Sequence, residues 1–249
     1  MKKLLYICIT TLLLSCSGNN IPDCFLASGA IIQKEVVVSE FTEIVVYDRV
    51  QLIVKEAPEQ KVTLETGENL LDGIAIKVVG NQLILKNNNS CNIARNYGLT
   101  KVYVSSPNIT FIRSSTGLPV VSDGVLSYPE FKIFSDDTDE KGKYNTAGDF
   151  RMELKCKNLW VRNNNISNMY LSGTAENMLL ESRSGDSRFE GRFLIVQDIE
   201  VFHRSSNDMI LNPQKSITGE IRSTGNIILV NEPPVVDVKA VYKGQLKIE

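Results

Sequence analysis

A repeat of about twenty residues dominates the sequence after residue 100. Each unit has a short stretch of alternating apolar and polar residues, a small polar corner, and a second alternating stretch. Aligning Val161, Glu181, Phe202 and Ile221 gives steps of 20, 21 and 19 residues. A unit this short cannot bury its apolar side alone, so the repeat predicts a solenoid. In chain order the copies are ITFIRSSTGLPVV, FKIFSDDTDE, LWVRNNNISNMYL, MLLESRSGDSRFE, IEVFHRSSNDMIL and GEIRSTGNIILV.

The corners predict how the strands connect. They contain residues that tolerate a left-handed backbone, namely Gly117, Gly185 and Gly225 with Asn163–Asn165 and Asn207. An antiparallel sandwich would use two-residue Asn-Gly or Asp-Gly hairpin turns, which are rare in this chain. We therefore expect an all-β fold, a right-handed parallel β-helix-like solenoid with short rungs, and the sandwich is the alternative.

The segment before the repeat also has the pattern of strands. EFTEIVVYDRVQLIVKEA alternates apolar and polar residues around a turn at Tyr47-Asp48-Arg49, and the alternation continues to residue 87. Only residues 68–74, ENLLDGI, indicate a helical turn. The whole of residues 35–249 is therefore expected to form one β domain.

The N-terminus has the pattern of an export signal. In MKKLLYICITTLLLSC, two lysines precede an apolar stretch that is too short to span a bilayer. The end of this stretch, Leu13-Leu14-Ser15-Cys16, is similar to a bacterial lipobox, in which the cysteine is lipidated and the chain is cut before it. We expect a signal peptide at 1–15, lipid attachment at Cys16 and a tether over 16–34. An ordinary signal peptide with an incidental cysteine is the alternative.

The charge of the exported chain excludes some classes of partner. Without residues 1–15 there remain 25 basic and 29 acidic residues, because only Lys2 and Lys3 leave with the signal. Such a chain has no electrostatic reason to bind nucleic acid or an anionic membrane surface. Its membrane contact is expected to be the N-terminal lipid alone.

Three cysteines remain besides Cys16. Cys24 and Cys91 lie in polar, turn-like segments, and they are the candidate disulfide pair because export permits oxidation. Cys156 alternates with charged residues in FRMELKCKNLWV, in phase with the apolar positions, so it is expected to be a buried free thiol. No cysteine or histidine has the spacing of zinc ligands, and no metal site is expected.

The chain resembles a known family. Its opening is similar to that of the family of the putative auto-transporter adhesin, head GIN domain, which has Phe-x-x-Ile, a strand, a Glu-Asn-Leu-Leu turn and a Gly-x-Leu strand. Here Phe41, Ile44, Glu68–Leu71, Gly80 and Leu83 match that pattern, and the Ser-Gly units and Gly225-Asn226-Ile227 match its later part. The resemblance covers about residues 35–232. It implies a β-helix-like adhesin domain in the cell envelope of Bacteroidetes-type bacteria.

The residues favour binding over catalysis. His203, the single histidine, ends a strand and is expected at a surface corner, and no serine has a nucleophile-elbow setting. There is no phosphate loop or dinucleotide motif, so no cofactor is expected. The acidic run Asp136, Asp137, Asp139 and Glu140 could hold calcium, although a solvated loop is the simpler interpretation.

Arginines recur near successive corners and form a candidate ligand edge. In register they would line one side of the solenoid and could bind an acidic polysaccharide, unless neighbouring carboxylates neutralise them. Tyr128, Tyr144, Trp160 and Tyr170 could stack on sugar rings or face the core. The edge consists of Arg113, Arg162, Arg183, Arg204 and Arg222.

We expect a non-enzymatic, lipid-anchored envelope protein that binds a glycan or another envelope protein. A polysaccharide lyase or glycoside hydrolase on a β-helix is one alternative, and it would need carboxylates grouped on one face. A purely structural envelope protein is the other alternative. The residues after Cys16, SGNNIPD, lack an early acidic run, which favours an outer-membrane lipoprotein that faces the periplasm over a surface-exposed one.

Overall fold

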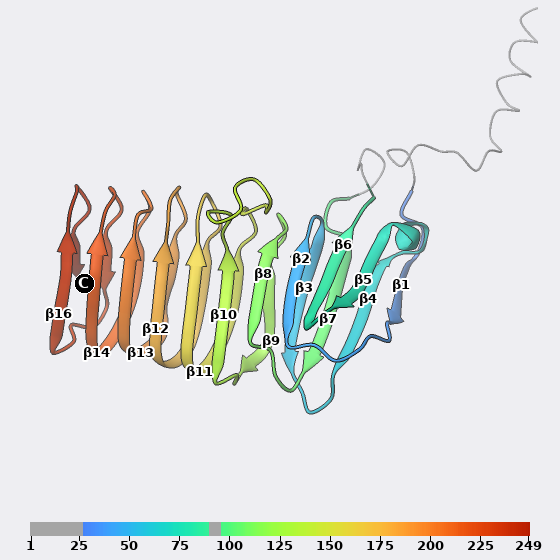
Figure 1. Cartoon of the computed structure of the whole chain (residues 1–249), viewed down its shortest axis with the longest axis horizontal. Coiled ribbons are helices and arrows are strands. Elements are labelled where there is room, and N and C mark those ends of the chain that lie inside the picture. The colour runs from blue at the N-terminus through green and yellow to red at the C-terminus, as the bar shows by residue number, and fades with distance from the viewer. Residues whose placement is uncertain (1–26, 90–95) are drawn as a thin grey trace, which may run out of the picture.

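The computed structural model describes residues 27–89 and 96–249, and in them the protein is all-β, as expected. Within these residues, seventeen strands join into one curled, mixed sheet, with one 3-10 helix near the N-terminal end (Figure 1). The elements are β1 (Ile31–Glu35), β2 (Glu43–Tyr47), β3 (Val50–Glu56), β4 (Lys61–Gly67), η2 (Glu68–Gly73), β5 (Ile74–Val79), β6 (Gln82–Asn87), β7 (Thr100–Ser106), β8 (Phe111–Ser115), β9 (Val120–Leu126), β10 (Glu130–Ser135), β11 (Phe150–Asn163), β12 (Met169–Ser182), β13 (Phe189–His203), β14 (Met209–Ile221), β15 (Ile227–Leu229), β16 (Val235–Ala240) and β17 (Leu246–Ile248). The first strand begins four residues before the start expected for the domain.

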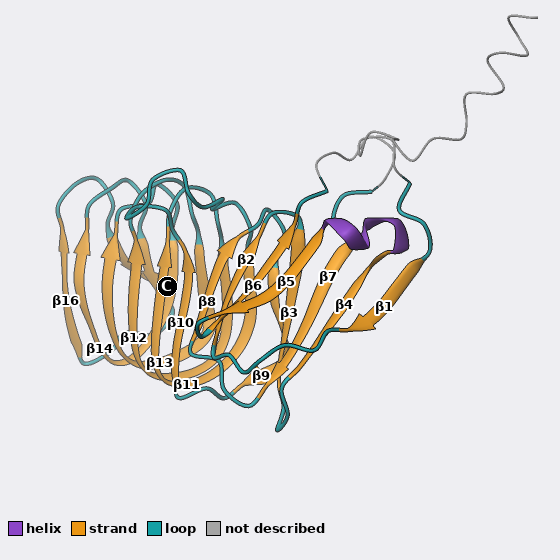
Figure 2. Ribbon diagram, turned by 45° about the vertical axis from the view of Figure 1, so that its right-hand side comes forward, coloured by secondary structure: helices purple, strands orange, loops and turns teal. Residues whose placement is uncertain are grey.

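The sheet forms two walls that enclose the core. The first wall contains, in spatial order, β5, β6, β2, β8, β10, the C-terminal halves of β11 to β14, and β16. The second wall contains β1, β4, β7, β3, β9, the N-terminal halves of β11 to β14, β15 and β17. Strands β11 to β14 bend from the second wall into the first, so the walls are one sheet (Figure 2).

The register confirms the period of the repeat and corrects its alignment. Arg162 pairs with Glu181, Glu181 with Phe202, and Phe202 with Glu220, all in parallel. The sequence alignment used Val161 and Ile221 in place of Arg162 and Glu220 and was wrong by one residue at both ends. Val161 and Ile221 are fully buried and face the core, whereas Glu181 and Phe202 face outward.

The N-terminal third departs from the expected parallel solenoid. β1 pairs with β4, β4 with β7, and β5 with β6 in antiparallel fashion. The rungs are also not short further along the chain, because β11 to β14 run for 13 to 15 residues without a break. A strand can turn between walls without ending where small residues and bulges allow it, as at the register shifts of β12 with β13.

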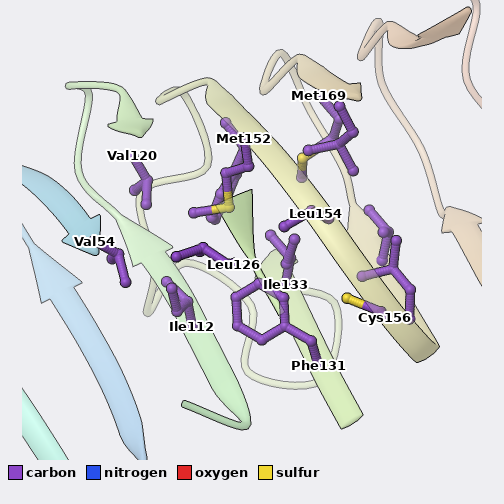
Figure 3. Packing of buried hydrophobic residues seen from close by; sticks show 14 of the residues in the cluster. Val54, Ile112, Val120, Leu126, Phe131, Ile133, Met152, Leu154, Cys156 and Met169 are labelled. Carbon is purple, nitrogen blue, oxygen red and sulfur yellow. The ribbon is translucent and has the colours of Figure 1, made fainter. Parts of the chain in front are cut away.

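The apolar core lies between the walls and continues from coil to coil (Figure 3). In β11, Phe150, Met152, Leu154 and Cys156 are buried while the residues between them face solvent. Each large apolar side chain buried in this way contributes about 1.5–3 kcal/mol. Cys156 is a buried free thiol, as its phase in the sequence predicted, and burial raises the pKa of that thiol to about 12.

The connections from the first wall back to the second stack along one edge of the molecule (Figure 2). In Asn165 and Gly185 the backbone is left-handed, with φ of 56° and 87°. Successive corners bond to each other, since Asp186 N–H donates to the Asn165 carbonyl at 2.6 Å and Ser206 N–H to that of Gly185 at 2.9 Å. A Cβ at Gly185 would lie 2.3 Å from the Asn165 carbonyl oxygen, so only glycine fits this corner.

Candidate functional site

The outer face of the first wall has a row of open hollows. Four of them run across the strands from β2 to β16, and they share lining residues. Lys132 and Trp160 line the first two, and Leu179 lines the last three. At ~4.8 Å per strand, the seven strands from β8 to β16 give this surface a length of about 30 Å. We call it the outer groove.

Three aromatic rings form the end of the outer groove nearest the N-terminal strands. Phe111 and Phe134 meet edge to face with centroids 5.2 Å apart, and Phe134 and Trp160 do so at 5.0 Å. Phe134 is buried, whereas Phe111 and Trp160 are partly exposed, and the Lys132 ammonium lies 5.4 Å from the Trp160 ring centroid. The hollow at this end has a volume of ≈ 520 Å³. Its lining consists of Glu43, Thr110, Phe111, Glu130, Lys132, Phe134 and Trp160.

Arg162 holds this end of the groove together. Its Nε donates to Glu181 at 3.1 Å and its Nη1 to Asp139 at 3.1 Å. The same guanidinium lies 4.8 Å from the Phe134 ring centroid and 4.9 Å from that of Trp160. Trp160 Nε1 donates to the same Glu181 carboxylate at 2.7 Å. Arg162 is buried, so this pairing fixes the orientation of the aromatic rings.

Glu181 is ionised in this setting. Its burial raises the pKa, but hydrogen bonds from Trp160 and Arg183 and the charge of Arg162 outweigh that effect and leave the pKa below its usual value. The carboxylate is therefore an acceptor and a negative charge at neutral pH, and it has no proton to donate.

The other end of the outer groove is acidic. Glu181, Glu200 and Glu220 lie on three successive coils around Phe202, with Lys239 beyond them, and line a cavity of ≈ 450 Å³. The pKa of Glu220 is lowered, chiefly because Arg222 Nε donates a hydrogen bond to its carboxylate at 2.5 Å.

A row of short polar side chains borders the outer groove where the strands of the first wall begin. Asn177 Nδ2 donates to Asn158 Oδ1 at 2.9 Å, and Asn158 Nδ2 donates to Glu130 at 2.6 Å. On the next coils, Ser216 Oγ donates to Asp198 at 2.6 Å. These amide and carboxylate groups lie beside the aromatic rings and can bond hydroxyl groups of a ligand.

The structure does not bring the five predicted arginines into one row. Arg113 and Arg162 occupy one column of the first wall, since both pair with Phe134. Arg183, Arg204 and Arg222 follow the strands at the corners, two positions later, where their backbone N–H groups bond the preceding coil. The column of Arg113 and Arg162 continues with Glu181, Phe202, Glu220 and Lys239.

Most of these arginines have protein partners. Arg113 donates to the Asp136 carbonyl at 2.6 Å and lies 4.3 Å from the Tyr144 ring centroid. Arg183 pairs with Glu181 and Asp139 at 3.0 and 3.5 Å, and Arg222 pairs with Glu220 at 2.5 Å. Arg204 is exposed at its corner. Whether the edge binds a ligand stays a prediction.

The acidic loop is tied to the protein rather than open. Asp137 accepts a hydrogen bond from Asn164 at 2.6 Å, which lowers its pKa, and Asp139 pairs with Arg162 and Arg183. Glu140 pairs with Lys143. Within residues 27–89 and 96–249, no group of three or more acidic, histidine or cysteine side chains is placed to hold a metal ion.

His203 lies in the core, and its expected position at a surface corner was wrong. It belongs to a column of inward-facing polar side chains that pair coil by coil, and neither ring nitrogen makes a well-formed hydrogen bond with the described residues. Burial lowers the pKa of His203 to about 4, while Asp208 and the backbone of Gly225 and Asn207 raise it in part. A buried neutral imidazole cannot act on a ligand at the surface. The column consists of Ser114, Ser135, Asn163, Ser182 and His203.

Sequence reasoning missed part of the site. Phe111, Phe134 and Lys132 were not candidates, although each alternates with a buried residue of β8 or β10, which is the signal for an outward position. Tyr128 proved to be buried, with its hydroxyl donating to the Ser106 carbonyl at 2.9 Å. Trp160 faces outward.

The predicted lipid site Cys16 and the predicted disulfide pair Cys24 and Cys91 lie outside the described residues. Within residues 27–89 and 96–249, no helix has the length and hydropathy of a membrane span.

Comparisons with known proteins identify the family through a family model and the fold through solved structures. The family model described as "Putative auto-transporter adhesin, head GIN domain" matches residues 40–233. No curated protein matches the chain.

Several solved structures share the fold. A putative adhesin from Bacteroides fragilis has a TM-score of 0.78 and 21% identity, with 88% of this chain and 97% of that one covered. A putative lipid binding protein from Parabacteroides distasonis has a TM-score of 0.64 and 12% identity, with 90% and 98% covered. A putative adhesin from Parabacteroides merdae has a TM-score of 0.64 and 15% identity, with the same coverage. At these identities the similarity concerns the fold alone.

Proposed function

Since the chain belongs to the family of the putative auto-transporter adhesin, head GIN domain, we propose that it is a non-enzymatic binding protein of the bacterial cell envelope whose outer groove binds a glycan. The observation that carries the proposal is the aromatic end of the groove. There, Phe111 and Trp160 are partly exposed beside Lys132 and Glu130, in a cavity of ≈ 520 Å³.

A glycan fits the chemistry of this surface. The apolar face of a sugar ring packs on an aromatic side chain, and its hydroxyl groups bond to carboxylates, amides and ammonium groups. The outer groove offers aromatic rings at one end and the ladder of Asn158 and Asn177 along its side. Its open form and its length of about 30 Å suit an extended polymer that crosses several coils.

The charges of the groove favour a neutral glycan over an acidic one. Arg162, Arg183 and Arg222, which an acidic polysaccharide would need, are already paired with Glu181, Asp139 and Glu220. An acidic chain would also meet three carboxylates at the far end of the groove.

A polysaccharide hydrolase or lyase is a second candidate, because Glu181, Glu200 and Glu220 line one cavity. A glycoside hydrolase needs a carboxylic acid that keeps its proton near neutral pH, usually through a raised pKa. The pKa values of Glu181 and Glu220 are both lowered, which argues against that role. We therefore favour binding without cleavage.

The proposal includes the position of the protein in the envelope and the form of its coils. Lipid at Cys16 would anchor it to the outer membrane through the segment that precedes β1. Every pairing between β8 and the later strands is parallel, and this supports a right-handed β-helix for that part of the chain. A crystal structure of the chain would check the hand of the coils.

The direct test is a glycan array with residues 17–249, using neutral and acidic glycans, followed by titration of each hit. We expect binding to neutral glycans that is weakened at least tenfold by Trp160→Ala. Tyr170→Ala is the matched control, since Tyr170 is an aromatic residue on the second wall, 4.1 Å from the Arg151 guanidinium. A cooperative urea transition in each variant would show that the variant is folded.

Three outcomes would contradict parts of the proposal. Equal losses in the two variants would move the site away from the outer groove. Release of new reducing ends from a bound glycan would favour the enzyme. No binding to any glycan would favour a protein partner or a structural role. Separately, Cys16→Ala should free the protein from membranes, and protease treatment of intact cells would reveal whether it faces outward.

A further inference from the structure

The two ends of the sheet differ in how they are closed. At the N-terminal end, β5 folds back on β6 in antiparallel fashion, and η2 places Leu70 in the core. Leu71, Ile74 and Ile76 pack against the core at the same end. A stack of coils needs such a cap, because its last coil otherwise exposes apolar surface and unpaired backbone groups.

The C-terminal end has no such closure in the described residues. There, β16 pairs with β14 alone and β17 with β15 alone, so the outer edges of both strands are unpaired (Figure 1). Five large apolar side chains at this end are 39–61% exposed. They are Val235, Val236, Val241, Tyr242 and Ile248.

We propose that a second copy of the chain covers this end, with β16 of the two copies paired antiparallel about a two-fold axis at Val238. An axis perpendicular to the walls keeps the first wall of one copy in line with the first wall of the other. The same axis brings the two β17 edges together, and Ile248 is exposed there. Such an interface is isologous, so each contact occurs twice.

The charges of β16 select this register. Centred on Val238, it sets Asp237 opposite Lys239 of the second copy, and Lys239 opposite Asp237 of the second copy. Neither side chain has an ion pair among the described residues. Moving the centre by one residue, to 237 or 239, would set Asp237 opposite Asp237 or Lys239 opposite Lys239 of the second copy, and like charges opposite each other destabilise a strand pair.

The apolar residues agree with the same register. Val235 would lie opposite Val241 of the second copy, and Val236 opposite Ala240 of the second copy. Val236 and Val238 are in line with Ile217 and Gly219 of β14, so they face the exposed end of the core. A register centred between two residues is excluded, because it would set an outward side chain opposite an inward one.

The pairing would join two outer grooves. The groove ends at Glu220 and Lys239, next to β16, so the grooves of two copies would meet at the two-fold axis. A polymer could then contact both copies at once and gain apparent affinity without any new contact.

The first test is a cross-link made with the full chain in mild detergent. At the two-fold axis the two copies of residue 238 have Cα atoms about 4.5–5.5 Å apart, within the range for a disulfide. We expect Val238→Cys to form a covalent dimer under mild oxidation. Val235→Cys is the matched control, since the two copies of residue 235 would lie about 20 Å apart. The parent chain measures any cross-linking by its own cysteines.

The second test uses charge reversal and analytical ultracentrifugation of the full chain. Lys239→Asp sets like charges opposite each other and should weaken the dimer at least tenfold. Asp237→Lys combined with Lys239→Asp restores opposite charges and should return the affinity to within about twofold of the parent. A parent chain that stays monomeric at micromolar concentration would overturn the proposal. So would equal cross-linking at residues 235 and 238, or a dimer that Lys239→Asp leaves unchanged.

Discussion

Lowering the pH from 7 to 5 should destabilise this protein through one side chain, His203. The imidazole is fully buried in the polar column between Ser182 and Ile221, and it is the single histidine of the chain. Desolvation by burial lowers its pKa from 6.5 to about 4 in the folded state. The unfolded state keeps the ordinary value, so the two states bind protons differently over this range.

The sign and the magnitude follow from this difference. As the pH falls through 6.5, His203 takes up a proton in the unfolded state but stays neutral in the folded state, so the free energy of unfolding decreases. The loss amounts to about 2 kcal/mol between pH 7 and 5, and it approaches about 3.5 kcal/mol well below pH 4, at ~1.4 kcal/mol for each pKa unit. Carboxylates with lowered pKa values, such as Glu181 and Asp208, add their own losses only below about pH 4.5.

Urea unfolding at a series of pH values from 7.5 to 4.5 measures this loss. The matched variant is His203→Asn, because Asn163 occupies the equivalent position two coils earlier and an amide does not titrate. We expect the parent to lose stability between pH 7 and 5 and the variant to show a flat profile. A parent whose free energy of unfolding changes by less than about 0.5 kcal/mol over this range would refute the reasoning, as would a variant with the same slope.

Other parts of the structure give three more predictions. Gly219→Ala should cost several kcal/mol in urea unfolding, because φ at residue 219 is +132° and a Cβ there would lie 1.9 Å from the Val201 carbonyl oxygen of the neighbouring coil. Gly80→Ala is the control and should cost only about 1 kcal/mol, because a Cβ at residue 80 would have nothing within 4 Å. Arg162→Ala should cost about 3–5 kcal/mol, because it removes one of the two cationic partners of Glu181 and the ion pair of the buried Asp136. Arg222→Ala, at an exposed pair, should leave the urea midpoint close to that of the parent. The Cys156 thiol, with a pKa raised to about 12, should resist maleimide at pH 7.5 until the protein is unfolded, as peptide mass spectrometry would detect.

Much of the fold was predictable because strands and stacked coils each produce a periodic pattern of apolar residues in the sequence. The alternation in FRMELKCKNLWV assigned Cys156 to the core, and the spacing of the corners gave the period of the coils. The antiparallel pairing of β1, β4 and β5 was not predictable in this way. A strand has the same alternation in either direction, and its partner depends on contacts between residues far apart in the chain.

The candidate site was harder to predict than the fold. Trp160 was a candidate from its residue type, but its position beside Phe134 and Arg162 depends on a register that differs by one residue from the sequence alignment. One residue changes which side chains face outward, because the side-chain period of a strand is two. The arginines of the predicted edge fall into two columns because Arg183, Arg204 and Arg222 lie two positions further along their coils than the column that contains Arg113 and Arg162.

The sequence by itself determined that this chain forms stacked strands with an apolar interior, because alternation and a twenty-residue period are local properties. It also indicated the family, through short motifs around Phe41 and Glu68. Only the tertiary structure decided that His203 is buried and that the aromatic rings meet in one groove. It also decided that, within residues 27–89 and 96–249, one end of the sheet is capped and the other has free strand edges. These properties depend on which coil lies beside which, and that is set by packing across the walls rather than by neighbours in the chain.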